Sequence, residues 1–211
     1  MVEQISYARV KSDPLSAKTY SHRKQDKHDQ EMRMLAKAFA KIPDINTVLD
    51  APCGVGRASI WLAGQGHTVT GIDLGKAALT LAGELAAEAG VSVDFASHDI
   101  FDLPYTDKQY DATLCFRLLH HFDSEALRAR LIAEMCRVSG QYVVMSRITP
   151  YSVTSLRRRL RFSLFGKPIK QYPVTAAQLD AEFAKHGFSP VSQFGGSEFL
   201  HSLQLHVYMR G

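Results

Sequence analysis

Segments typical of β-strands alternate with segments typical of α-helices along most of this chain. β-branched or apolar runs occur at residues 47–49, 68–72, 91–96, 110–116 and 141–146, and helical patterns at 57–62, 76–89 and 124–138 lie between most of them. This alternation predicts a mostly parallel sheet with helices on both faces. The expected fold class is therefore α/β.

The last two strand-like segments, at about 188–194 and 201–209, are joined by only a few residues. A connection this short cannot hold a helical crossover, so these strands are expected to form an antiparallel hairpin. They bring the expected sheet to seven strands. The length of 211 residues suits one domain spanning 1–211.

Composition favours a globular protein of the cytoplasm. Hydrophobic residues make up 45% of the chain and charged residues 22%, and no apolar run approaches the roughly 20 residues that span a bilayer. Residues 1–11 lack the apolar core of a secretory signal. Cys53, Cys115 and Cys136 show no paired or metal-binding spacing, which predicts a reducing compartment and no metal site.

The turn after the first strand is the most informative local motif. It reads Asp50-Ala51-Pro52-Cys53-Gly54-Val55-Gly56-Arg57 and leads directly from a strand into a helix. Gly54 and Gly56 allow a tight turn and close approach of the backbone to a ligand. Free N–H groups at the helix start complete a geometry typical of nucleotide-type sites, although such a turn can also serve packing alone.

Acidic residues end the next two strands. Asp73 ends the second strand, where a carboxylate can accept both hydroxyls of a ribose or simply cap the next helix. Asp99 follows the third strand and could accept from an adenine amino group, with apolar neighbours against the ring. Because the carboxyl ends of parallel strands share one edge, these groups are expected to form one rim.

Over residues 45–147 these motifs resemble those of the class I S-adenosylmethionine (SAM)-dependent methyltransferases of the small-molecule type. Asp50 to Arg57 is similar to the family's first motif, and Gly71-Ile72-Asp73-Leu74 to its second. The resemblance implies a Rossmann-like fold, SAM as cofactor and S-adenosylhomocysteine as product. One departure is Pro52, which stands at a motif glycine and removes one N–H donor. A dinucleotide site is the weaker reading, since Ser59 occupies its third glycine position.

The resemblance also implies roles for individual residues. The methionine end of SAM would contact Asp50, Ala51, Gly54 and Gly56, next to Arg57. The ribose would contact Asp73, next to Leu74, and the adenine would contact Asp99 and Ile100. Phe116 and Arg117 would close the pocket. Arg23 could pair with the SAM carboxylate or be a solvated surface residue. The segments 1–42 and 148–174 are expected to cap the site and to cover the substrate.

The methyl acceptor is expected to be a small molecule that receives the group on oxygen or nitrogen. His121 and His120 follow the fourth strand, where a histidine could act as a general base or contact the substrate, or could merely pack locally. The chain lacks the Asn/Asp-Pro-Pro-aromatic motif typical of base-amine methylation and has no added RNA-binding module, so nucleic acid is an unlikely partner. The residues do not indicate an oligomeric state.

The net charge of +4 is concentrated in one segment. Residues 151–179 carry six Lys or Arg and no acid, and Leu156, Leu160 and Leu164 recur there at helical spacing. Three interpretations stay open for 156–165: a lid whose leucines pack on the core, a peripheral membrane contact that collects a lipid- or quinone-like acceptor, or recognition of an anionic acceptor. A non-catalytic SAM-binding protein is a further alternative.

Overall fold

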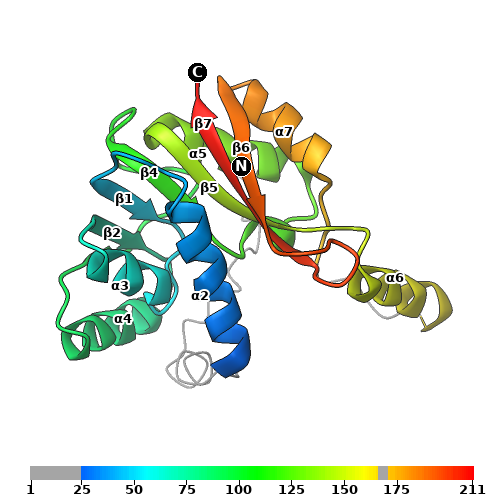
Figure 1. The fold of residues 1–211 in the computed structure, drawn as a ribbon, viewed down its shortest axis with the longest axis horizontal. Helices are drawn as coiled ribbons and strands as arrows, with labels where there is room; N and C mark the ends of the chain where they lie inside the picture. Colours follow the sequence, from blue (N-terminus) through cyan, green and yellow to red (C-terminus); the bar gives the residue numbers. More distant parts are fainter. Residues whose placement is uncertain (1–24, 166–170) are drawn as a thin grey trace, which may run out of the picture.

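The computed structural model describes residues 25–165 and 171–211 (Figure 1). One sheet runs through the middle of the molecule, with helices on both sides of it. The elements in chain order are α2 (Gln25–Phe39), β1 (Thr47–Asp50), α3 (Arg57–Gly64), β2 (Thr68–Ile72), α4 (Lys76–Glu88), β3 (Asp94–Ala96), β4 (Tyr110–Cys115), the 3-10 helix η1 (Leu119–His121), α5 (Glu125–Val138), β5 (Ser139–Ile148), α6 (Val153–Phe165), α7 (Ala176–Ala184), β6 (Phe188–Phe194) and β7 (Leu203–Arg210).

The sheet confirms the expected fold class. Its seven strands have the order β3-β2-β1-β4-β5-β7-β6, and β1 to β5 pair in parallel. β7 is antiparallel to both β5 and β6, so the expected C-terminal hairpin is present. The strand order reverses at β1, which lies between β2 and β4. The carboxyl ends of β1 and β4 therefore flank the point where ligands bind in open α/β sheets.

Two strands differ in length from the sequence expectation. β3 covers only Asp94–Ala96 rather than 91–96, and it is the edge strand beside β2. β5 extends to Ser139–Ile148 because β4 pairs with its residues 139–145 and β7 pairs with its residues 142–148. The last residues of β5 extend beyond the end of β4, where they pair with β7, and lead towards α6.

Two apolar layers hold the helices to the sheet. On one face α2 and α3 pack against β1, β4 and β7 through side chains such as Leu35, Leu62 and Val207. On the other face α5 and α7 pack through Met135 and Phe183. Helix termini follow local chemistry, since Thr175 and Gln178 form a reciprocal capping box at the start of α7.

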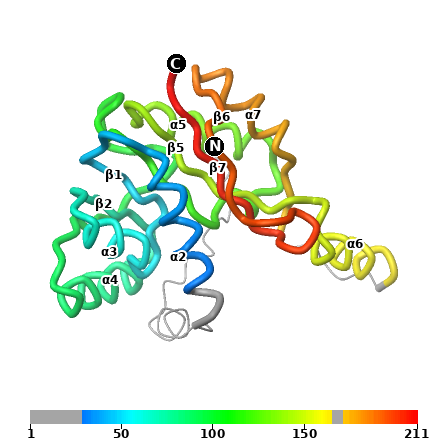
Figure 2. The backbone as a smooth tube through the Cα atoms, in the orientation of Figure 1, coloured from blue at the N-terminus to red at the C-terminus, as the bar shows by residue number. Residues whose placement is uncertain are grey.

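The basic segment forms α6, but its leucines do not reach the core. Leu156, Leu160 and Leu164 are 60%, 56% and 64% exposed. The interpretation of this segment as a lid with its leucine stripe packed on the core is therefore wrong. Figure 2 shows α6 extending away from the sheet, near the connection between β6 and β7.

In residues 25–165 and 171–211 no helix has the length and apolarity needed to cross a bilayer. The same residues contain no group of three or more His, Cys, Asp or Glu side chains arranged to hold a metal ion.

Candidate functional site

The glycine turn and the acid after β2 are joined directly. Gly54 has a φ of 58° and Gly56 a φ of 74°, conformations that glycine adopts at little cost. The Gly54 amide donates to Asp73 Oδ2 at 2.9 Å, and the Gly75 amide donates to Asp73 Oδ1 at 2.8 Å. Asp73 is half-buried and the neighbouring Leu74 is exposed, so this part of the rim is open to solvent.

The absence of a side chain at Gly56 also allows close packing, which the sequence does not indicate. A Cβ atom at this position would lie 2.8 Å from the Phe95 ring and 2.9 Å from the Ala82 Cβ. The side of Gly56 that lacks a side chain thus faces β3 and α4. Its backbone remains at the start of α3, where N–H groups point out of the helix.

Asp50 lies beneath the turn and is only 1% exposed. Its Oδ2 accepts a 2.6 Å hydrogen bond from the Ser59 hydroxyl, while Oδ1 has no hydrogen-bond partner among the described residues. Burial raises the pKa of Asp50 to about 7, although the Ser59 hydrogen bond lowers it. A buried carboxylate oxygen without a partner favours an added donor such as an ammonium group. Ala51, next in the chain, is fully buried.

The third strand contributes Asp99 and Ile100. Asp99 is half-buried, and its Oδ1 accepts from the Phe101 amide at 3.0 Å, which fixes the loop that follows β3. Ile100 is buried in the apolar layer under the sheet edge. The structure therefore brings Asp50, Asp73 and Asp99 to the ends of three neighbouring strands, as expected.

Phe116 and Arg117 follow β4, and Arg117 connects to the N-terminal helix. Phe116 is half-buried against the α2 layer. Arg117 has a φ of 65°, and its guanidinium contacts Glu31 of α2. Arg57 contacts the same carboxylate at 3.1 Å from the first turn of α3. Glu31 is buried, so one shared carboxylate fixes α2 to the start of α3 and to the loop after β4.

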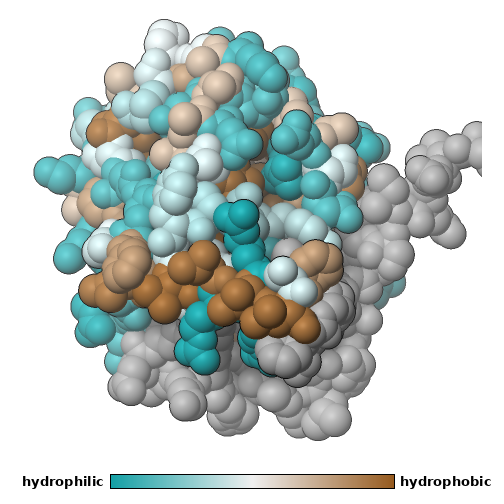
Figure 3. Space-filling model, turned by 90° about the vertical axis from the view of Figure 1, so that its right-hand side faces the viewer, coloured by the Kyte–Doolittle hydropathy of each residue, from teal (hydrophilic) through white to brown (hydrophobic). Residues whose placement is uncertain are grey.

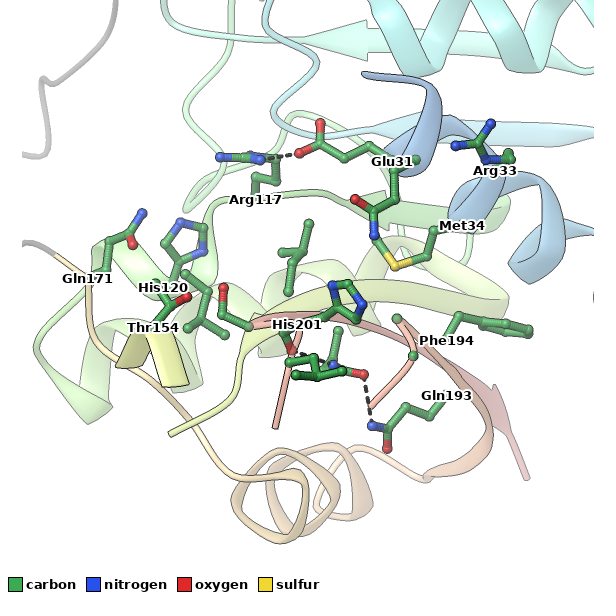
Figure 4. Close-up of a pocket in the computed structure, with 18 of the residues that line it drawn as sticks. Glu31, Arg33, Met34, Arg117, His120, Thr154, Gln171, Gln193, Phe194 and His201 are labelled. Atoms are coloured by element: carbon green, nitrogen blue, oxygen red, sulfur yellow. Dashed lines mark hydrogen bonds and ion pairs between the residues drawn. The ribbon is translucent and has the colours of Figure 1, made fainter. Parts of the chain in front are cut away.

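A cavity of about 700 Å³ lies beside this cluster (Figure 4). In the close-up, Glu31 and Arg117 lie on one side, His120, Thr154 and Gln171 on another, and Gln193 and His201 opposite α2. Of the described residues, four cationic side chains line it, Arg33, Lys37, Arg117 and Arg158, against one carboxylate, Glu31. The cavity is thus formed by α2, η1, α6 and the connection between β6 and β7.

Comparison with known proteins identifies the central part of the chain. Residues 48–141 match a family model described as a methyltransferase domain. Over these residues the chain is similar to methyltransferase domains. In overall fold it is similar to magnesium protoporphyrin IX methyltransferase from Synechocystis, with 19% identity, a TM-score of 0.73 and coverage of 88% of this chain and 84% of that one. It is likewise similar to a protein from Pyrococcus horikoshii, with 20% identity, a TM-score of 0.72 and coverage of 90% and 93%.

Curated relatives match the same methyltransferase domain. Ubiquinone biosynthesis O-methyltransferase from Marinobacter nauticus is 37% identical over 99 residues, which are 46% of this chain and 42% of the relative. The protein of the same name from Pseudomonas savastanoi is 37% identical over 95 residues, covering 44% and 41%. The alignments thus span less than half the length of these relatives. Most of the cavity lining lies outside the 48–141 match, in α2, α6 and the β6–β7 connection.

The two histidines of the methyltransferase domain differ in position. His120 lines the cavity and is 1% exposed, whereas His121 is exposed, with its ring centroid 4.4 Å from that of His120. Neither ring nitrogen of His120 has a hydrogen-bond partner in the described chain. Burial lowers the pKa of His120 to about 3, with further contributions from His121, Arg117 and Arg158. His120 is therefore neutral at neutral pH, with ring nitrogens available to a ligand.

Two more buried polar atoms next to this cavity have no hydrogen-bond partner within the described residues. They are the Arg158 Nη1 atom, from α6, and the Gln171 Oε1 atom, from the segment before α7. The sequence motifs do not distinguish Gln171, Glu31 or His201, and they place Arg158 only within the basic segment. Native structures rarely leave buried polar atoms unsatisfied, so their grouping around one cavity favours a polar ligand there.

A buried polar network supports the far wall of the cavity. The Arg147 guanidinium of β5 is fully buried and contacts His206 Nε2 at 2.7 Å, the Val174 carbonyl at 3.0 Å and the Glu198 carboxylate. Glu198 also accepts from Gln193 at 2.8 Å. This network holds the β6–β7 connection against β5. Among the other sequence-derived candidates, Arg23 lies outside the described residues.

Proposed function

We propose that this protein is an enzyme that binds SAM at the carboxyl ends of β1, β2 and β3 and transfers its methyl group to a small acceptor in the adjoining cavity. The observation that supports the proposal most is that the rim at the strand ends and the cavity are directly connected. Arg57 at the glycine turn and Arg117 at the cavity are joined through the single Glu31 carboxylate. A cofactor on the rim and an acceptor in the cavity would therefore meet near the end of β4.

The rim residues suit the parts of SAM. The unpartnered Oδ1 of Asp50 suits the ammonium group, and the Asp73 oxygens keep lone pairs for ribose hydroxyls after accepting two amide bonds. Asp99 and Ile100 suit the adenine. Arg57 and Arg117 suit the SAM carboxylate, with which Glu31 would compete. These assignments are expected to hold for the bound state, when the rim closes on the cofactor.

Methyl transfer is a displacement in line with the sulfonium. A lone pair of an acceptor oxygen or nitrogen forms the new bond to carbon, the S–CH₃ electron pair returns to sulfur, and the acceptor proton goes to a base. His120 is the residue that we assign to accept this proton, since it is neutral and lines the cavity. An anionic group of the acceptor beside Arg158 would offset the positive charges that lower the pKa of His120. The acceptor class is accordingly a hydroxylated or amino-bearing acid.

The segments around the cavity then determine the acceptor. Met34 of α2 and Thr154 and Arg158 of α6 line it, consistent with cap functions for 1–42 and 148–174. The three free cysteines are consistent with a reducing compartment such as the cytoplasm.

The first test of this proposal is calorimetric titration of SAM and S-adenosylhomocysteine into the purified chain. Micromolar binding of both is expected, and no binding of either would contradict the proposal. Release of S-adenosylhomocysteine is then measured with a panel of hydroxy and amino acids, each paired with its uncharged amide. Higher turnover with the acids is expected. Binding without turnover of any acceptor would instead favour a non-catalytic SAM-binding protein.

A matched pair of variants tests the base. His120→Gln is expected to lower kcat by about 10²–10⁴-fold while leaving SAM affinity unchanged. His121→Gln changes the exposed neighbour and is expected to retain most activity. Equal activity of the two variants would remove His120 from the mechanism.

A further inference from the structure

Among the residues that the structure describes, the buried contacts of helix α6 lie mainly at its start. Ser152 and Ser155 are buried, and the Ser155 hydroxyl donates to the Thr149 carbonyl at 2.7 Å. The Ser152 hydroxyl accepts from the Ser155 amide at 3.1 Å. From Leu156 to Leu164 every side chain is exposed except that of Arg158, which is half-buried. A short helix with this little support in water normally gains its stability by burying an apolar face against something.

The exposed side of α6 continues into the β6–β7 connection. The Val153 amide donates to the Phe199 carbonyl at 2.9 Å, so the two segments are neighbours. Phe199 and Leu200 are 61% and 63% exposed, similar to the leucines of α6. Figure 3 shows apolar side chains gathered in a band on this face. We call the set Leu156, Leu160, Leu164, Phe199 and Leu200 the apolar band.

Arginines flank the leucines of the apolar band. At about 100° per residue, Leu156, Leu160 and Leu164 fall within about 80° of helix circumference. Arg157 and Arg161 follow on one side of that stripe and Arg159 on the other, all exposed. The helix sequence Val153–Phe165 contains no acidic residue. Figure 3 likewise shows strongly hydrophilic side chains beside the band.

This arrangement matches one kind of partner. Leucines between arginines suit the boundary of a bilayer, where the apolar side chains enter the acyl region and the guanidinium groups remain among anionic headgroups. At 13 residues α6 is far too short to cross a bilayer, so it would lie in the plane of the surface. We propose that the apolar band and its flanking arginines dock this protein on anionic lipid membranes.

The docking surface adjoins the mouth of the cavity. Thr154 and Arg158 of α6 and Leu200 and His201 of the β6–β7 connection belong to the cavity lining. Arg158 lies on the side of α6 away from the leucine stripe, towards the cavity. In a docked protein the leucine stripe would therefore face the membrane, while the opposite side of α6 faces the cavity. The docking itself is independent of the proposed methyl transfer and can be tested without an acceptor.

The test is flotation of the full chain with vesicles of phosphatidylcholine alone or of phosphatidylcholine mixed with phosphatidylglycerol. Binding is expected with the mixed vesicles, weaker at high salt, and little with phosphatidylcholine alone. Arg157→Glu/Arg161→Glu is expected to reduce partitioning into mixed vesicles by more than about 25-fold. Leu160→Asp is expected to reduce it by at least about tenfold, because its side chain no longer enters the acyl region.

Two matched controls make the same change of charge, or the same loss of an exposed apolar side chain, at positions outside α6. Lys41→Glu/Lys185→Glu alters the net charge as much as the double arginine variant, and Val191→Asp replaces an exposed apolar residue on β6. Both controls are expected to bind mixed vesicles like the unaltered chain. The proposal is overturned if the folded chain binds neither vesicle type, or if the α6 variants bind as well as the controls. A dimer that dissociates on Leu160→Asp, without vesicle binding, would assign the band to a second copy instead.

Discussion

The amide of Gly54 donates a 2.9 Å hydrogen bond to the carboxylate of Asp73, which joins the turn after β1 to the end of β2. The same carboxylate accepts from Gly75 at the start of α4. Asp73 therefore shapes the rim as well as being the assigned ribose ligand. A substitution there is expected to change ligand affinity more than global stability, because Asp73 is half-buried.

Asp73→Ala is expected to weaken SAM binding by about 1.5–3 kcal/mol, the usual value of hydrogen bonds to a charged group. The measurement is calorimetric titration, accompanied by a thermal unfolding curve that establishes folding. Glu88→Ala, at the exposed end of α4, is the control and is expected to leave SAM affinity unchanged. Equal affinity of a folded Asp73→Ala protein would refute the ribose assignment.

Replacing Gly56, at the start of α3, or Gly64, at its end, by alanine is expected to change the free energy of unfolding in opposite directions. Gly56→Ala should lower the free energy of unfolding by about 2–4 kcal/mol, since its φ is 74° and its Cβ would meet Phe95 and Ala82. Gly64→Ala should raise it by up to about 1 kcal/mol, because that position is open and lies within α3. Urea unfolding of both variants checks the pair, and similar losses in both would contradict the packing argument for Gly56.

His120 is expected to make stability depend on pH. Its pKa is lowered from 6.5 to about 3, so between these values the unfolded chain binds a proton that the folded chain does not. The contribution of neutral His120 to the free energy of unfolding is full above about pH 6.5 and is lost as the pH falls below that value. Between about pH 7 and 5 the unaltered chain should lose about 2 kcal/mol more than His120→Gln. Asp50 titrates in the opposite direction but is present in both proteins. Urea titrations at the two pH values measure the difference, and equal losses would show that His120 is protonated in the fold.

Glu198→Ala should lower the free energy of unfolding by about 2–4 kcal/mol. The reason is that the fully buried Arg147 guanidinium would lose its carboxylate partner. Glu125→Ala removes a carboxylate from an exposed pair with Arg128 and should cost under about 1 kcal/mol. Thermal unfolding ranks the two variants. If Glu198→Ala lowers the free energy of unfolding as little as Glu125→Ala does, water or another group must hydrogen-bond to the Arg147 guanidinium.

The rim was predictable because each of its residues comes shortly after the end of a strand. Asp73 directly follows β2, Gly54 and Asp99 lie in the loops after β1 and β3, and parallel pairing brings such positions to one edge. The strand pattern likewise predicted the order of elements and the terminal hairpin. These inferences depend on local periodicity and on general rules of sheet topology.

The acceptor cavity was not predictable in this way, since its walls come from distant segments. Glu31 lies four residues before Leu35 on the buried stripe of α2, and an acid within an apolar stripe is a signal that could have been noticed. Arg147 in an apolar strand is a similar signal. Nothing local indicates that Gln171 and His201 would lie at the same cavity, because their approach depends on how α6 and the β6–β7 connection fold back. The leucine periodicity of α6 did predict a helix, but periodicity does not indicate what the apolar face of that helix packs against.

The position of β7 between β5 and β6 has a consequence for how the protein is made. β7 is translated after every other strand of the sheet, yet both β5 and β6 take their antiparallel partner from it. On the ribosome, β1 to β5 can pair as soon as they emerge, while one edge of β5 and the whole of β6 stay without a partner until residues 203–210 have left the exit tunnel. During that interval an apolar strand edge is exposed in the nascent chain, and such an edge can pair with a strand of another chain.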